Sequence, residues 1–369
     1  MSAPSATRNS VPRGPIVNSL TSGQLPRFIE LYSAIGALVV SAGILVLMGR
    51  LNVVGELVVA AIVYLIGIGV MSSLVENRRK ATDRVVRGLV TVAFLLAMAP
   101  LVSTLATVVI RGIGQINWAF VSTTTAHVFD AKTLVVSTHT GALQSIVGTL
   151  IITGIAALIS IPIGILTAIY LVEYARGGTW LSRTVTLLVD VMTGIPSIVA
   201  GLFAFSLFTI LVGPKAFSGF SASVALSVLM IPIVVRSSEE MLKLVSLELR
   251  EASYALGVSK FSTITKIVLP TAIAGLVTGV MLAIARVIGE TAPIFVAASF
   301  TDNFNSNALV GAMNTLAVQA YAAYKFPGTD VAASINSAWG AALLLIIIVV
   351  ILNLIARIVA RVFAPKGLR

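Results

Sequence analysis

Long apolar stretches separated by short polar connections follow one another along the chain from about residue 31 to residue 364. A helix needs about 20 apolar residues to cross the hydrocarbon core of a membrane, and several of these stretches reach or exceed that length. None of them alternates apolar with polar residues as the strands of a membrane barrel do. The pattern predicts eight transmembrane helices, at residues 31–49, 53–75, 88–110, 141–172, 184–212, 220–235, 268–300 and 336–364.

Three of the predicted helices contain positions at which a helix bends or breaks. The stretches 141–172 and 268–300 are longer than a perpendicular crossing needs, so we expect them to tilt or to kink at Pro162 and Pro293. The Gly-Ile-Pro-Ser sequence at 194–197 also breaks a helix within the membrane. Such a break either lines a pathway or permits close packing, and the sequence favours neither.

The chain divides by composition into four segments. The first is rich in Ser and Pro, and we expect it to be a disordered cytoplasmic tail. The second is a two-helix hairpin whose glycines, Gly36, Gly43, Gly67 and Gly69, suit close helix packing. The predicted segments are the tail at 1–30, the hairpin at 31–75, a first core helix with an outer loop at 76–140, and the main transmembrane domain at 141–364, which contains a loop at 236–266.

Composition confirms that lipid must solvate this chain. It is 57% hydrophobic and only 11% charged, with a mean hydropathy of +1.03, so it carries more apolar surface than a water-soluble core of 369 residues can bury. It contains no cysteine, which excludes disulfides and thiolate metal sites. Its two histidines, His127 and His139, lie in one polar loop, and we expect neither a metal site nor a cofactor.

The basic residues indicate the orientation of the chain in the membrane. The net charge is +11, and nineteen of the 25 lysines and arginines fall on the side that holds the two termini and the loop 236–266. Five fall on the opposite side, and Arg286 lies within a span. Because cytoplasmic loops are enriched in Lys and Arg, we expect both termini to be cytoplasmic. The first apolar run has no cleavage site after it, so it is interpreted as a retained span.

The loop 236–266 has its own helical pattern. Glu-Ala-Ser-Tyr-Ala-Leu-Gly at 251–257 is followed, after nine residues, by Ile-Val-Leu-Pro at 267–270. Gly257 permits a sharp turn between two short helices, and Pro270 marks the entry into the next span. Tyr254, Leu256 and Phe261 would be exposed on these helices, where a groove in a cytoplasmic partner would bury them. An amphipathic surface helix without a partner is the alternative.

This arrangement resembles the EAA loop of bacterial ABC import permeases, whose pattern is Glu-Ala-Ala, three residues, Gly, nine residues, Ile-x-Leu-Pro. The loop departs from that pattern only at Ser253, where alanine is usual. The resemblance implies that the loop docks in a separate ATP-binding subunit. The chain has no Gly-x-x-x-x-Gly-Lys-Ser/Thr phosphate loop, so we expect it not to be an enzyme. The coupling residues that the resemblance implies are Glu251, Ala252, Ser253, Gly257, Leu269 and Pro270.

Two opposite charges lie in the middle of the stretch 268–300. Arg286 and Glu290 are four residues apart, so on a continuous helix they share one face. Charges at such depth cost roughly 2.5–3.5 kcal/mol each on insertion scales, so we expect them to pair and to face a protein interior or a wet cavity. The pair either locks helices together or serves a substrate pathway. Asp190 is interpreted as a structural partner of Arg183 or as a helix cap, and Glu239 and Glu240 as solvated charges.

The sequence around this pair resembles one family in particular. Ala-Arg-Val-Ile-Gly-Glu-Thr-Ala-Pro at 285–293 is similar to the Arg-x-Ile-Gly-Glu-Thr-Ala-Pro signature of PstA, the A-type permease family of phosphate ABC importers. The stretches 148–174 and 194–203 also agree with that family, and the resemblance covers roughly 85–360. The companion C-type permeases usually continue with Met-Ala after Gly-Glu-Thr, so Ala292 and Pro293 favour the A-type family.

The resemblance implies an all-helical bundle with a MetI-like permease core of about six helices, to which the N-terminal hairpin is added. It also implies a phosphate pathway in the bacterial inner membrane. Arg286 would bind phosphate oxygens through its planar fork of donors, Glu290 would hold the arginine between passages, and Thr291 would add a hydroxyl donor. Sulfate, molybdate or phosphonate would suit the same arginine, so the residues alone leave the oxyanion open.

The implied partners are two ATP-binding subunits, a second permease of the C type, and an extracytoplasmic phosphate-binding protein. A secondary transporter is one alternative, since intramembrane acids would suit it, but it leaves the EAA-like loop without a role. A membrane enzyme is a second alternative. It lacks support, because no nucleophile, base and orienting group recur together in a recognisable motif.

Overall fold

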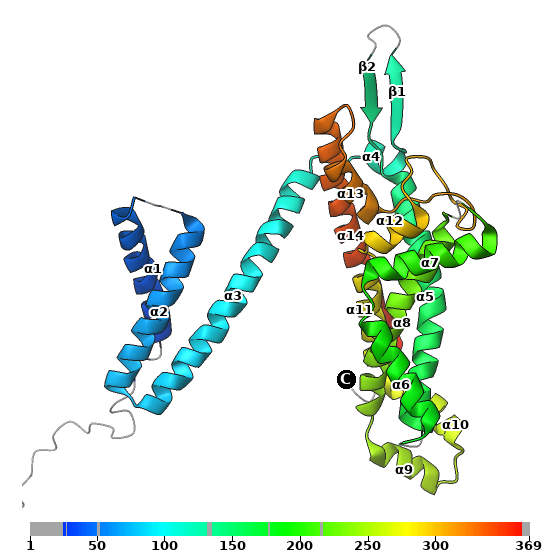
Figure 1. Ribbon diagram of the computed structural model, residues 1–369. Helices are drawn as coiled ribbons and strands as arrows, with labels where there is room; N and C mark the ends of the chain where they lie inside the picture. The colour runs from blue at the N-terminus through cyan, green and yellow to red at the C-terminus, as the bar shows by residue number, and fades with distance from the viewer. Residues whose placement is uncertain are drawn as a thin grey trace, which may run out of the picture. The chain divides into compact units, whose positions relative to one another are not determined.

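The computed structural model describes residues 25–26, 28–49, 52–130, 135–175, 178–214 and 217–363 (Figure 1). Most of the N-terminal tail predicted to be disordered lies outside this part of the chain. Within the described ranges, seven helices are long and apolar enough to cross a membrane, and they become eight if α6 (Trp180–Thr193) and α7 (Ser197–Val212) form one bent span. The predicted all-helical, polytopic bundle is confirmed.

The chain forms two compact units, which divide between residues 104 and 105, inside the long helix α3 (Arg78–Gly112). The first unit contains α1 (Ile29–Leu47) and α2 (Val53–Val75), which pack against each other as a hairpin and correspond to the hairpin predicted at 31–75. Most of their large apolar side chains are exposed, as expected for helices that lipid surrounds.

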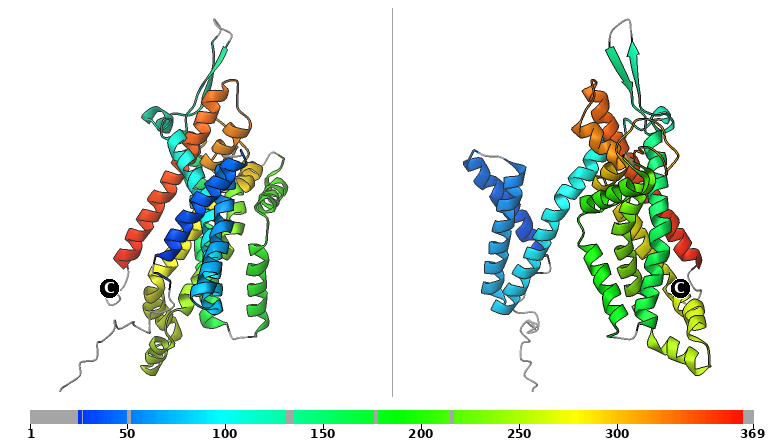
Figure 2. Two further views of the ribbon diagram at one scale, coloured as in Figure 1. Left: turned by 90° about the vertical axis from the view of Figure 1, so that its left-hand side faces the viewer. Right: turned by 45° about the vertical axis from the view of Figure 1, so that its right-hand side comes forward.

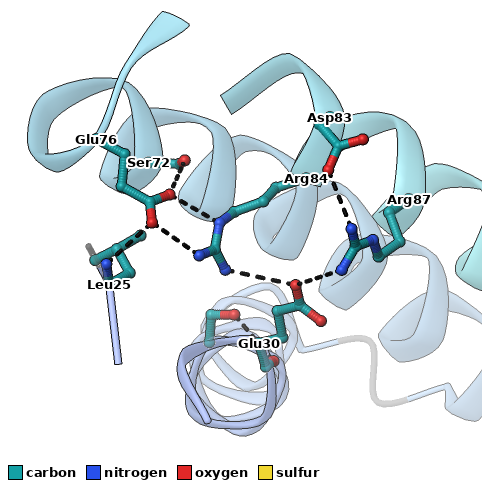
Figure 3. Close-up of polar contacts among 8 residues, drawn as sticks. Leu25, Glu30, Ser72, Glu76, Asp83, Arg84 and Arg87 are labelled. Atoms are coloured by element: carbon teal, nitrogen blue, oxygen red, sulfur yellow. Dashed lines mark hydrogen bonds and ion pairs between the residues drawn. The ribbon is translucent and has the colours of Figure 1, made fainter. Parts of the chain in front are cut away.

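An ionic network holds the turn between α2 and α3 (Figure 3). The carboxylate of Glu76 lies 2.9 Å from both Nε and Nη2 of Arg84, and it also accepts hydrogen bonds from the backbone N–H of Leu25 and the hydroxyl of Ser72. The Arg84 guanidinium is the main reason that the pKa of Glu76 falls to about 2. Glu30 on α1 lies 3.5 Å from Nη1 of Arg84, so the same arginine ties α1 to this turn.

The glycines of the hairpin only partly fulfil the expectation of close packing. A Cβ atom added to Gly36, Gly43 or Gly67 would have no neighbouring atom of this chain within 4 Å. An added Cβ at Gly69 would lie 3.0 Å from Cγ2 of Val85 on α3. Close packing was therefore correctly predicted at Gly69, whereas the described residues leave open space beside the other three glycines.

The second unit is built around α5 (Leu143–Ile169) and α8 (Gly219–Lys243), which pack along each other (Figure 2). Next to α8 lies α11 (Leu269–Val287), which also contacts α14 (Val331–Phe363). Their interior is an apolar cluster that includes Ile152, Leu226 and Met230, none of them exposed. Gly148 permits the close approach of α5 to a loop, because an added Cβ would lie 2.0 Å from the carbonyl oxygen of Asn314.

One end of the second unit carries short elements that the sequence did not predict (Figure 1). The outer loop predicted within 76–140 contains α4 (Trp118–Ser122) and two antiparallel strands, β1 (Ala126–Asp130) and β2 (Val135–His139), with Ala126 opposite His139. A further helix, α13 (Leu316–Lys325), packs against α14 at the same end. Its first turn is capped by the hydroxyl of Thr315, which accepts a hydrogen bond from the N–H of Val318.

Two predicted spans are broken. The expected break at 194–197 is present, because α6 and α7 meet there at a bend of 107°. The stretch 268–300, predicted to be one kinked span, ends instead at Val287, and α12 (Ala292–Ala298) follows after four residues. Pro293 lies in the first turn of α12, where its missing N–H costs no hydrogen bond, so it starts a new helix instead of kinking the old one.

Candidate functional site

The loop predicted to couple to a partner folds into two short helices joined by a tight turn. They are α9 (Leu247–Ala255) and α10 (Lys260–Thr263), and we call residues 247–263 the coupling segment. Gly257 lies between them with a φ of 71°, in the left-handed region that favours glycine. The prediction of helices on both sides of Gly257 is confirmed. After α10 the chain passes through a π-helical turn, η2 (Ile264–Val268), into α11.

Apolar side chains cover the outer surface of the coupling segment. Leu256 is 83% exposed and Phe261 is 70% exposed, and Tyr254 is exposed as well, as the sequence predicted. Leu244 and Leu247, at the entrance to α9, are also exposed. The two helices of the segment lie at one end of the second unit (Figure 1). An exposed apolar patch of this kind is typical of a surface that a protein partner covers.

The six predicted coupling residues do not all share this surface. Glu251, Ala252 and Gly257 are exposed on it. Ser253 points inward, and its hydroxyl lies 2.8 Å from the buried hydroxyl of Thr263, so it ties α9 to α10 across the turn. Leu269 and Pro270 belong to the first turn of α11, where Leu269 packs against an apolar cluster beneath the segment. The serine that departs from the EAA pattern therefore makes a contact that alanine cannot make.

Sequence reasoning missed Arg250, which was counted only among the basic residues on the side of the loop 236–266. Its side chain is 10% exposed, and its guanidinium lies 3.0 Å from the carboxylate of Glu173, whose side chain is 6% exposed. It also donates hydrogen bonds to the carbonyl oxygens of Leu242 and Val245, at 2.8 and 2.7 Å. An arginine directly before the Glu-Ala-Ser sequence was the signal available, but its carboxylate partner Glu173 lies 77 positions away in the chain.

The predicted charged pair lies at the break after α11. Nη1 of Arg286 is 3.4 Å from Oε1 of Glu290, and Thr291 occupies the N-cap position of α12. The side chain of Glu290 is 15% exposed, whereas that of Arg286 is 69% exposed. The predicted pairing of the two charges is present, and the carboxylate end of the pair is largely buried. Among the residues that the structure describes, Arg286 pairs with Glu290 alone, so the contact does not lock two long helices together.

The break explains this geometry. With α11 ending at Val287, Glu290 sits in the connection to α12, and the backbone there approaches α7 closely. A Cβ added to Gly201 of α7 would lie 2.7 Å from the Cα atom of Pro293. The structure thus brings together the two motifs at 194–203 and 285–293, and the side chain of Arg286 beside the break is exposed.

A second cluster of charges lies near the coupling segment, on α6 and α8. Asp190 pairs with Arg236 rather than with Arg183, so the predicted partner was wrong, although the structural interpretation of Asp190 holds. Glu239 accepts from both Arg236 and Lys243, at 2.8 and 2.7 Å, and its side chain is only 12% exposed. Glu239 is therefore a paired residue, not the solvated charge that was expected.

Residues 160–368 match the family described as binding-protein-dependent transport system inner membrane component. The chain is 41% identical over 283 residues to the phosphate transport system permease protein PstA 1 of Mycobacterium tuberculosis, covering 76% of this chain and 90% of that protein. It is 35% identical over 304 residues to the phosphate transport system permease protein PstA of Yersinia pestis, covering 80% and 96% of the two chains.

A solved structure of the MetNI methionine ABC transporter in an inward-facing conformation is also similar to this chain. The TM-score is 0.47 at 23% sequence identity, and the alignment covers 61% of this chain and 95% of that chain.

Proposed function

The chain belongs to the family of binding-protein-dependent transport system inner membrane components, and within it to the PstA permeases, and we propose that it forms half of the pathway through which an ATP-driven importer takes up inorganic phosphate. It is the permease subunit of a phosphate ABC importer, a multi-pass protein of the inner membrane without a catalytic role. The observation that carries this conclusion is the 41% identity that extends over 90% of the M. tuberculosis permease.

The chain is a component of an ABC transporter with ATP-binding subunits, and we propose that its coupling segment docks in one of them. The exposed apolar side chains of Leu256, Phe261 and Tyr254 support this, because a groove in the partner would remove them from water. Glu251 and Ala252 lie on the same surface and would line the contact. The other proposed partners are a second permease of the C type and an extracytoplasmic phosphate-binding protein.

Arg286 is the proposed phosphate contact of the pathway. An exposed guanidinium within the membrane region would be costly against lipid, so it is better explained if it faces water or the second permease. Its 3.4 Å contact with Glu290 leaves most of its donors free for an oxyanion. Glu290, which is largely buried, would hold the arginine when no phosphate is bound, and Thr291 would add a hydroxyl donor from the start of α12.

The proposed transport domain is residues 141–364, which contain the coupling segment and the charged pair. The helix in 76–140 with its outer loop completes the core, and the hairpin at 31–75 is an addition outside it. The match to the permease family over 160–368 supports the first of these assignments.

Both termini and the coupling segment are proposed to face the cytoplasm, and single cysteines test this. The asymmetry of Lys and Arg supports this orientation, as does an even number of crossings when α6 and α7 are one span. The chain contains no natural cysteine, so Ser306→Cys and Ser259→Cys can each be labelled alone, and both positions are exposed. An impermeant thiol reagent applied outside should label Ser306→Cys and spare Ser259→Cys. The opposite labelling pattern would invert the proposed topology.

Purification from the native membrane tests the assembly. Solubilised in mild detergent, the chain should copurify with an ATP-binding subunit and with a second permease, identified by mass spectrometry. A chain with Leu256→Glu and Phe261→Glu should retain the second permease and lose the ATP-binding subunit, because two charges would have to enter an apolar groove. Recovery of a lone chain that transports phosphate by itself would refute the assignment.

A further inference from the structure

The coupling segment is held by a part of the chain that is remote from it in sequence. After α5 the helix continues as a π-helical turn, η1 (Tyr170–Tyr174), in which the N–H of Ala175 donates to the carbonyl of Tyr170 at 2.7 Å. The two final residues of η1 each contact a different helix of the coupling segment: Glu173 contacts α9, and Tyr174 contacts α10. Short π-helical turns occur frequently at functional sites.

The contact of Glu173 with α9 is buried and carries several hydrogen bonds. Both Nε and Nη2 of Arg250 lie near Oε1 of Glu173, at 3.1 and 3.0 Å. The same guanidinium donates to Leu242, in the last turn of α8, and to Val245 just beyond it. Arg250 therefore adds charged donors to carbonyls at and just beyond the end of α8 while it holds Glu173. One side chain thus joins α9, the end of α8 and η1.

The contact of Tyr174 with α10 is more exposed. The ammonium group of Lys260 lies 5.0 Å from the centre of the Tyr174 ring, in the geometry of a cation–π interaction. Because Lys260 follows the turn at Gly257 and Arg250 precedes it, η1 is attached to the coupling segment on both sides of that turn. Below these contacts, Ala168, Val172 and Val268 belong to one apolar cluster that joins α5 and η1 to η2.

The far end of α5 meets the opposite end of the unit. The hydroxyl of Thr149, two turns into α5, accepts a hydrogen bond from the N–H of Leu316 at 2.9 Å, and Gly148 packs on the carbonyl of Asn314. Thr149 and Leu316 are both buried. If α5 moved along its axis, these contacts would therefore move the loop before α13. This loop lies at the same end of the second unit as the β hairpin (Figure 2).

We infer that η1 is a clasp, in which Glu173 and Tyr174 hold Arg250 and Lys260, and that this clasp transmits movement of the coupling segment directly to α5. The inference rests on the proposed function, which assigns the coupling segment to an ATP-binding partner. The segment is joined covalently to α8 and α11, and the clasp adds α5 as a third helix that follows it. Glu173 and Arg250 are thus positioning residues that do not touch the substrate.

The test uses the complete transporter in proteoliposomes and measures phosphate uptake and ATP hydrolysis together. Glu173→Gln removes the charge that holds Arg250, so it should lower the phosphate transported per ATP hydrolysed by about tenfold or more, with the complex still assembled. Glu240→Gln is the matched control, because Glu240 is exposed on α8 outside the clasp, and it should leave this ratio unchanged. An unchanged ratio in Glu173→Gln would overturn the inference.

A distance measurement gives a second result that does not depend on transport. Spin labels on Leu166→Cys in α5 and Ser259→Cys beside α10 should keep one distance between the nucleotide-free and ATP-bound complexes, because the clasp moves both together. The Tyr174→Leu variant leaves the buried ion pair intact, so it should fold, but it removes the ring that Lys260 contacts. In this variant the distribution of distances between the two labels should broaden on ATP binding. The Tyr174→Phe variant keeps the ring and should keep a single distance. A distance that changes in the unmodified clasp would overturn the inference. Failure of the proposed function would instead appear as an unmodified complex that transports no phosphate.

Discussion

Replacing Gly257 by valine is expected to reduce ATP-driven phosphate uptake by roughly tenfold or more, while the amount of protein in the membrane stays the same. The φ of Gly257 is 71°, and a side chain in the left-handed region costs about 1–2 kcal/mol, with β-branched residues the least tolerant. The chain would relieve this strain by reopening the turn between α9 and α10. The measurement is uptake by cells or proteoliposomes together with the amount of ATP-binding subunit that copurifies.

Asparagine at the same position is the matched control. Asparagine tolerates the left-handed conformation, so Gly257→Asn enlarges the side chain and keeps the turn, and it should retain most of the uptake. A valine variant that still assembles and transports as well as the asparagine variant would show that the turn does not couple this chain to its partner.

Replacing Arg286 by glutamine should lower uptake by roughly ten- to a hundredfold, the factor that corresponds to losing about 1.5–3 kcal/mol from a hydrogen bond to a charged group. The arginine is the proposed phosphate contact, and its removal leaves the largely buried carboxylate of Glu290 without its partner. Glu290→Gln should also lower uptake. Arg357→Gln, which removes an exposed arginine from α14, is the control and should transport normally.

The double variant Arg286→Gln with Glu290→Gln separates a substrate contact from a structural pair. Removal of both charges leaves no unpaired charge, so the chain should fold and bind its ATP-binding subunit. If Arg286 meets the anion, uptake stays as low as in the single variant. Uptake restored to the normal level would show instead that the pair has only a structural role.

The sequence predicted the number and order of the membrane helices well, because long apolar runs have few alternatives in lipid. It was less able to locate their ends. The stretch 220–235 was predicted to end where charges begin, yet α8 continues to Lys243. Its charged last turns are stabilised by contacts of Glu239 with Arg236 and Lys243, three and four residues away, which support a helix in water as well as in lipid.

The end of α11 at Val287, within the stretch 268–300, could not be predicted from hydropathy either. Residues 288–291 and the helix after them belong to one largely apolar stretch that includes Pro293, so hydropathy does not distinguish a kinked helix from two helices. The break separates the charged pair, because Arg286 lies in the last turn of α11 and Glu290 lies in the connection after it. The partner of Asp190 was predicted wrongly because Arg183 is near in sequence, whereas Arg236 is near only in the folded chain.

The burial of Arg250 and its pairing with Glu173 could not be predicted from the local sequence. A charged residue in a loop predicted to be cytoplasmic is expected to be solvated, and Glu173 lies 77 positions away in the chain. Only the packing of η1 beside α9 brings the two together and buries them. The EAA-like motif, by contrast, could be predicted with its turn and its exposed apolar residues, because glycine at 257 and the helical spacing on both sides define the local backbone.

The most direct measurement of the central claim is uptake of labelled phosphate into proteoliposomes that contain this chain, a second permease and the ATP-binding subunits, with the phosphate-binding protein added outside. We predict that phosphate accumulates only when ATP is present within, on the side of the coupling segment, and that sulfate and molybdate do not accumulate. Accumulation of another oxyanion in preference to phosphate, or phosphate uptake driven by an ion gradient without ATP, would contradict the account.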